Sequence, residues 1–179
     1  MPRLFTGLEI PAHIGQELST YRGGLPGARW VDPENYHITL RFIGDVDYAM
    51  ARDVFSILGE GRRRGPFTVT LDQLASFGGE RPRAVFARAV PTSDLNDLQA
   101  EQERLVRRVG LPPEKRKFTP HVTLARLRRD ASPLDVADYI AMRGQFPKLS
   151  FTAEQFVLFS SRDSVGGGPY VVEAAYPLR

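Results

Sequence analysis

Cysteine is missing from this chain of 179 residues. Its absence excludes disulfide bonds, thiolate catalysis and cysteine-ligated metal sites, and it is in keeping with a reducing compartment. No apolar run reaches the roughly 20 residues of a membrane-spanning helix, and the stretch Met1–Ile10 is too short and too polar for a secretory signal. We therefore expect a cytoplasmic protein that does not associate with membranes.

Lysine is scarce as well, with 3 residues against 21 arginines, although the net charge is only +3. The cations gather in clusters, and two of these flank His121: Lys115-Arg116-Lys117 before it, and Arg126 with Arg128-Arg129 after it. The guanidinium fork matches phosphate oxygens, so this pattern favours an anionic, phosphate-bearing substrate. With 42% hydrophobic and 25% charged residues, the chain is long enough for one domain with a sizeable core.

Two of the three histidines belong to a repeated motif, His-apolar-Thr-Leu, which occurs at 37–40 and again 84 residues later at 121–124. Residues i and i+2 of a strand share a face, so each copy presents an imidazole beside a hydroxyl and turns its apolar residues to the core. One imidazole that accepts a proton and one that donates it form a general base and general acid, and Thr39 and Thr123 are placed to hold an oxyanion. The neighbours of His37 and His121 are not the carboxylates or cysteines of a zinc site, so we predict no metal.

The repeat extends beyond the motif. The same offset of 84 lays the helix-like stretch 49–58 on 133–142 and the apolar opening Leu4–Ile10 on Arg88–Asp94. A repeat of this length, present twice, indicates two similar lobes related by a pseudo-twofold axis. We predict that residues 1–179 form a single two-lobed domain, with a cleft that receives one histidine from each lobe.

Strands and helices are expected in an order that places some strands next to strands, which predicts an α+β domain. The stretch from Gly23-Gly24 to Pro33 is expected to be a loop, and Gly166–Gly168 lacks the Lys-Ser/Thr of a P-loop and is expected to be a hairpin loop. The expected strands are Arg3–Glu9, Tyr36–Ile43, Phe67–Phe77, Arg83–Val90, His121–Leu127, Leu149–Ser160 and Pro169–Pro177, and the expected helices are Pro11–Tyr21, Asp47–Gly61, 92–109 and Pro133–Met142.

The motifs in their contexts, HITLRFIGDV and FTPHVTLARL, resemble those of the two-histidine phosphoesterases. Within that group, the chain resembles specifically the bacterial and archaeal RNA 2′,3′-cyclic phosphodiesterases once called 2′-5′ RNA ligases, or LigT-like proteins. The resemblance includes the opening RLFTGLEIP, the Trp30-Val31 element and the closing Gly-Pro-x-Tyr, and so spans the whole chain. It implies the LigT-like bilobal fold: two pseudo-symmetric lobes of mainly antiparallel sheet with outer helices around a central cleft.

This resemblance implies metal-independent hydrolysis of RNA 2′,3′-cyclic phosphate ends to 2′-phosphomonoesters, without a cofactor, and 2′-5′ RNA ligase activity as the reverse of related chemistry. His37 would be the proton donor and His121 the proton acceptor, although a symmetric cleft permits either polarity. Thr39 and Thr123 would bind phosphate oxygens. The substrate would be an RNA end, such as that of a tRNA fragment, or a nucleoside 2′,3′-cyclic phosphate, and the protein a monomer.

Further contacts to the nucleotide or RNA are expected around this centre. The resemblance places Phe42 and Arg126 against the terminal base, but strict alternation turns both away from the histidines, so each strand would need a bulge or a strong twist. Arg41 lies two residues after Thr39 and is therefore expected on the same face of the strand. The remaining candidates are Lys115, Arg116 and Lys117 near the second motif, and Tyr170 after the glycine loop.

Two alternative functions stay open at this point. One is a phosphodiesterase for small cyclic nucleotides or for other cyclic phosphates. The other is a non-catalytic module that binds RNA ends. The two intact imidazoles argue against the second, because arginines would serve equally well for phosphate binding alone.

Overall fold

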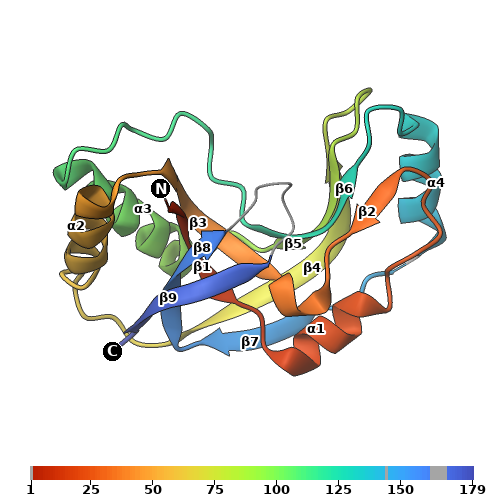
Figure 1. The fold of residues 1–179 in the computed structure, drawn as a ribbon. Helices are drawn as coiled ribbons and strands as arrows, with labels where there is room; N and C mark the ends of the chain where they lie inside the picture. The colour runs from red at the N-terminus through yellow and green to blue at the C-terminus, as the bar shows by residue number, and fades with distance from the viewer. Residues whose placement is uncertain (1, 144, 162–168) are drawn as a thin grey trace.

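The computed structural model describes residues 2–143, 145–161 and 169–179 as one mixed α/β structure (Figure 1). Four α-helices are present among these residues, with one short 3₁₀ helix (η1, Pro33–Asn35). The α-helices are α1 (Ala12–Ser19), α2 (Tyr48–Leu58), α3 (Ser93–Arg108) and α4 (Pro133–Met142). The strands are β1 (Arg3–Glu9), β2 (Ala28–Trp30), β3 (His37–Asp45), β4 (Phe67–Phe77), β5 (Ala84–Ala89), β6 (His121–Leu127), β7 (Leu149–Ala153), β8 (Gln155–Ser161) and β9 (Tyr170–Pro177).

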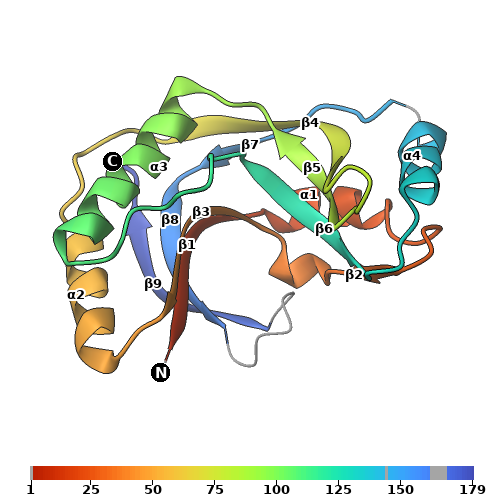
Figure 2. The ribbon, with the colours of Figure 1, turned by 90° about the horizontal axis from the view of Figure 1, so that it is seen from above.

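All nine strands join one sheet in the order β7-β4-β5-β6-β3-β1-β8-β9, with β2 attached to β6. Every strand pair in the described part of the chain is antiparallel. The sheet curves strongly, with α2 and α3 at one end and α1 and α4 at the other (Figures 1 and 2). The predicted α+β architecture, a mainly antiparallel sheet with helices outside it, is confirmed.

The strand order is balanced about its centre, where β6 meets β3. Each half of the sheet combines strands from both halves of the sequence: β4 and β5 lie with β6 and β7, and β1 and β3 lie with β8 and β9. The offset of 84 residues relates the two motif strands, and it relates α2 to α4 to within one residue. By its position in the strand order, however, β1 corresponds to β5. The expected match of Leu4–Ile10 with Arg88–Asp94 is therefore wrong, since the latter stretch runs from β5 into α3. The boundaries of the single domain stay a prediction.

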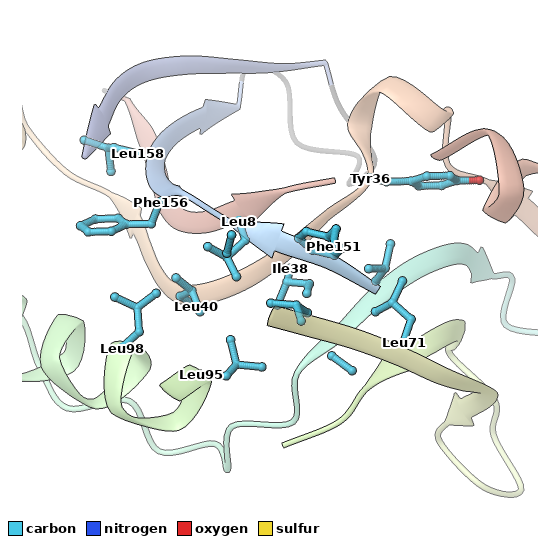
Figure 3. Packing of buried hydrophobic residues seen from close by; sticks show 14 of the residues in the cluster. Leu8, Tyr36, Ile38, Leu40, Leu71, Leu95, Leu98, Phe151, Phe156 and Leu158 are labelled. Carbon is cyan, nitrogen blue, oxygen red and sulfur yellow. The ribbon is translucent and has the colours of Figure 1, made fainter. Parts of the chain in front are cut away.

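The main core lies beneath the motif strands. Ile38 and Leu40 of β3 are buried together with Leu95 and Leu98 of α3, which packs on β3 (Figure 3). Leu95 and Leu98 lie three and six positions after Thr92, the N-cap of α3, whose side chain accepts a hydrogen bond from the Leu95 backbone N–H. This capping fixes where the apolar stripe of α3 meets the sheet.

The structure departs from the expected elements most clearly in three places. The second helix ends at Leu58 rather than Gly61. The stretch Leu149–Ser160 forms two strands, because β7 pairs with β4 at one edge of the sheet and β8 crosses to pair with β1. The expected loop before Pro33 contains the three-residue strand β2, which is too short to leave a periodic signal. The glycine loop at 166–168 lies outside the described residues.

Gly7 of β1 permits the close approach of β1 to the first motif strand. A Cβ built on Gly7 would lie 2.6 Å from the backbone oxygen of Ile38 and 3.1 Å from the Phe159 ring. Gly7 pairs with Thr39. The absence of a side chain at this position therefore sets the distance between β1 and the strand that carries His37 and Thr39.

We predict that Gly7→Ala lowers the free energy of unfolding by about 1–3 kcal/mol, the usual cost of overpacking, because the clash is with backbone that cannot move aside cheaply. Thermal or denaturant unfolding measures this loss. The matched control is Gly65→Ala, because a Cβ at Gly65 meets no atom within 4 Å. Equal stabilities of the two variants would contradict this account of β1.

Candidate active site

The two motif strands meet at one antiparallel bridge, in which Ile38 pairs with Val122. Both residues are fully buried. In an antiparallel pair, the residue before one partner lies opposite the residue after the other. The bridge therefore places His37 opposite Thr123 and Thr39 opposite His121, with all four side chains on the face that Ile38 and Val122 leave free. The structure brings together the four residues predicted to form the catalytic centre.

Both imidazoles are oriented by the same backbone contact. Nδ1 of His37 lies 2.9 Å from the carbonyl oxygen of Asn35, and Nδ1 of His121 lies 2.5 Å from that of Thr119. A carbonyl only accepts, so each Nδ1 carries a hydrogen and each neutral ring has its lone pair on Nε2. The hydroxyl of Thr39 lies 2.9 Å from Nε2 of His37 and donates to it in the neutral form. Nε2 is thus the atom of each ring that is set up for proton transfer.

Phenylalanine pairs enclose both imidazoles. The His37 ring centroid lies 5.0 Å from that of Phe5 and 5.5 Å from that of Phe159, and these two phenylalanines stack on each other. The His121 centroid lies 4.8 Å from that of Phe77 and 5.1 Å from that of Phe86, which also stack. Sequence reasoning missed all four phenylalanines, because they lie on strands distant in sequence from the motifs.

Burial is the main reason that both imidazoles resist protonation. It lowers the pKa of His37 from 6.5 to about 4, and it lowers the pKa of His121 as well. The nearby positive charge of Arg126 lowers both pKa values further, whereas the hydrogen bonds to Asn35 and Thr119 raise them. Both rings are therefore mainly neutral in the free protein at neutral pH.

A bulge in each motif strand brings Phe42 and Arg126 to the face of the histidines. On β3, Thr6 pairs with Arg41 but Gly7 pairs with Thr39, so one extra residue is inserted there. On β6, the pairs Val85–Ala125 and Phe86–Thr123 show the same insertion. Two consecutive residues of each strand are consequently buried, and the next one, Phe42 or Arg126, is exposed. The expected bulges are present.

Phe42 and Arg126 nevertheless lie on opposite sides of the histidines. Because β3 and β6 run antiparallel, five residues after His37 and five residues after His121 lead in opposite directions. Phe42, which is 41% exposed, pairs with Phe5, and Arg126 pairs with Ala84. The two side chains thus flank the centre as separate contact positions.

Arg41 does not line this face, which corrects the expectation from strand parity. The bulge turns its side chain inward, where it is 5% exposed. Its Nε donates to Glu103 at 2.8 Å, and its guanidinium also donates to the backbone oxygens of Phe42 and Pro112. Arg41 therefore anchors α3 and the segment that leads to β6, and its charge is taken up by Glu103.

The other candidate contacts differ in their surroundings. Tyr170 packs edge-on against His37, with ring centroids 5.0 Å apart, and thus lies at the centre. Lys115, Arg116 and Lys117 are exposed in the segment between α3 and β6, where Arg116 forms an ion pair with Glu114. Their contact with RNA stays a prediction.

Comparison with known proteins identifies the family. The model of the 2′-5′ RNA ligase superfamily matches residues 10–164. The chain belongs to this superfamily. The RNA 2′,3′-cyclic phosphodiesterase of Bacillus subtilis is 30% identical over 165 residues, which cover 88% of this chain and 87% of the relative. The enzyme of that name from Geobacillus stearothermophilus is 30% identical over 183 residues, which cover 97% of this chain but only 56% of the relative.

Solved structures of the superfamily share the fold. The crystal structure of Escherichia coli LigT complexed with 3′-AMP has a TM-score of 0.78 and 27% identity, and the match covers 99% of both chains. The resemblance to LigT-like proteins is confirmed. None of the helices in the described residues has the length and hydropathy of a membrane span. Nor do His, Asp and Glu side chains in this part of the chain form a group of three or more that could hold a metal ion.

We predict that the low pKa of His37 makes folding stability sensitive to pH. The unfolded chain binds a proton at this position near pH 6.5, whereas the native protein does so only at about 4. Between these values the unfolded state holds more protons, so the stability falls as the pH falls, by about 3 kcal/mol at most for this group. His37→Gln should remove that part of the dependence. Denaturant unfolding of both proteins from pH 7 to pH 4 measures the difference, and parallel curves would contradict the buried, neutral imidazole.

Proposed function

We propose that the protein hydrolyses RNA 2′,3′-cyclic phosphate ends to 2′-phosphomonoesters, by paired histidine acid-base catalysis and without a metal ion. The observation that carries the proposal is the arrangement around the Ile38–Val122 bridge, which sets two imidazoles and two threonine hydroxyls on one face. Membership of the 2′-5′ RNA ligase superfamily and the activity named for its relatives support it.

In the proposed reaction, Nε2 of His121 takes a proton from water as the water attacks the phosphorus atom opposite the 3′ oxygen. Nε2–H of His37 donates a proton to the 3′ oxygen as it leaves, so the phosphate stays on the 2′ position. The hydroxyls of Thr39 and Thr123 donate hydrogen bonds to the non-bridging oxygens. Positioning, proton transfer at opposite ends and charge stabilisation are the contributions that such a strained diester requires.

The side chains around the centre suit a nucleotide. Phe42 offers an exposed aromatic face on one side of the histidines, and Arg126 offers a guanidinium on the other. Bases stack on aromatic rings and on guanidinium planes in single-stranded RNA recognition. A small cyclic nucleotide would fit the same centre, and 2′-5′ ligation would use the same groups with a 5′-hydroxyl in place of water. The cytoplasmic location and the monomeric state remain predictions from the sequence.

We predict that His37→Ala and His121→Ala each lower turnover of an RNA 2′,3′-cyclic phosphate by at least about a hundredfold, because each removes one proton transfer. Thr39→Val and Thr123→Val should each cost about 10²–10³ in kcat, as for single oxyanion donors. The control is His13→Ala, which changes an exposed histidine on α1 and should keep full activity. Circular dichroism and melting curves check that the variants fold.

The same assays decide between the proposed function and its alternatives. We expect a 2′-phosphate product and activity that survives a strong chelator. Full activity of either histidine variant would remove the acid-base scheme, and a 3′-phosphate product would reverse the assignment of the two histidines. A protein that binds the RNA end without turnover would be a binding module. Turnover of nucleoside cyclic phosphates but not of RNA would favour the small-molecule function.

We predict that Lys115, Arg116 and Lys117 contact backbone phosphates of longer RNA. Replacing all three with Gln should raise the Michaelis constant for an RNA oligomer and make its binding less dependent on salt, since fewer counterions are displaced. The Michaelis constant for a nucleoside 2′,3′-cyclic phosphate should stay unchanged. Equal effects on both substrates would show that these cations are only a solvated surface.

A further inference from the structure

Two arginines lie directly opposite each other beside the proposed catalytic centre. Arg29 of β2 pairs with Arg126 of β6, and on its other side Arg126 pairs with Ala84 of β5. Directly opposite residues of antiparallel strands project to the same face of the sheet. Arg29 therefore shares the face of Arg126 and of the two histidines.

The residues around Arg29 support this orientation. Ala28 and Trp30 pack against the buried cluster that includes Val85 and Tyr139, on the opposite face of the sheet. Arg29 lies between them and is exposed, as Arg126 is. The alternation of β2 thus turns Arg29 away from this cluster and toward the side of the histidines.

The pair is unfavourable as it stands. Like charges directly opposite each other destabilise a sheet, and neither guanidinium forms an ion pair or a side-chain hydrogen bond with another described residue. Arg88, which lies opposite His121, is by contrast neutralised by an ion pair with Asp72. Two adjacent, uncompensated guanidinium groups that face a phosphoesterase centre are suited to an anion.

We propose that Arg29, directly opposite Arg126, binds a second phosphate of the substrate, the phosphodiester that joins the terminal nucleoside to the rest of the RNA, while Arg126 stays against the terminal base. The inference rests on the proposed function and names the part of the RNA that this side of the centre holds. Arg126 lies five residues after His121, roughly 16 Å along a straight strand, and its charge acts on both imidazoles. Arg126 is therefore within electrostatic reach of the histidines, and both arginines are exposed, so the RNA can continue into solvent.

The test compares three substrates with wild type and Arg29→Gln: a nucleoside 2′,3′-cyclic phosphate, the same compound with a free 5′-phosphate, and a dinucleotide that ends in a 2′,3′-cyclic phosphate. We expect Arg29→Gln to raise the Michaelis constant for the dinucleotide about tenfold, the size of one charge-assisted hydrogen bond, and to spare the plain nucleoside. The matched control is Arg52→Gln, which removes an exposed arginine of α2 that forms no ion pair among the described residues.

Each outcome bears on the proposal. A selective effect on the dinucleotide supports it, whereas an equal effect on all three substrates, or none on the dinucleotide, overturns it. A larger effect on the 5′-phosphorylated nucleoside than on the dinucleotide would assign Arg29 to a free phosphate and would also overturn it. The melting temperature of Arg29→Gln should not fall, because the change relieves charge repulsion.

A failure of the proposed function is recognised separately, because wild type would then turn over none of the three substrates. In that case the pair is tested by equilibrium binding of a dinucleotide 2′-phosphate and of a nucleoside 2′-phosphate. Arg29→Gln should weaken binding of the first about tenfold and leave binding of the second unchanged. Equal affinities of wild type and variant for the dinucleotide would reject the phosphate site.

Discussion

The contact on which the candidate centre depends is the single antiparallel bridge between Ile38 and Val122. It joins the two halves of the curved sheet, and its register alone decides which side chains meet above it. A shift by one residue would turn each imidazole into the core and each apolar residue into solvent. Because both bridge residues are fully buried, such a shift would expose Ile38 and Val122 and bury His37 and His121 without partners. The hydrophobic core beneath the strands thus holds the candidate catalytic groups in position.

The bulge that follows each motif divides the strand into two parts, in which opposite alternate positions are buried. Up to Thr39 and Thr123, strict alternation separates polar from apolar faces. Beyond them, one inserted residue reverses the parity, and the side chains that an unbroken strand would bury become exposed beside the centre. The same insertion buries Arg41, whose ion pair with Glu103 fixes α3 to β3. The bulge in β3 therefore exposes Phe42 beside the centre and also connects α3 to β3 through Arg41.

The sequence predicted what depends on local pattern and missed what depends on distant strands. His37, Thr39, His121 and Thr123 were predictable because each pair lies within one strand, where spacing alone defines the face. The helices were predictable from their caps and apolar spacing. The phenylalanines around the histidines, Arg29 beside Arg126 and the burial of Arg41 were not, because each depends on which strands become neighbours or on where a bulge falls. The exchange of β4 and β8 between the halves of the sheet is a property of topology that a repeat offset does not reveal.

The packing that orients the imidazoles also determines when a proton donor exists. With a pKa of about 4, His37 is protonated in about one molecule in a thousand at pH 7. An anionic phosphate next to Nε2 favours the charged ring and raises such a pKa by about 1–3 units. Under the proposed polarity, the substrate itself therefore creates the general acid, and the proton reaches His37 as the cyclic phosphate binds. The charge of Arg126 opposes protonation only while no phosphate is present to neutralise it. A neutral resting centre is thus compatible with acid-base catalysis, because the bound anion raises the pKa of the imidazole, which then takes a proton from solvent.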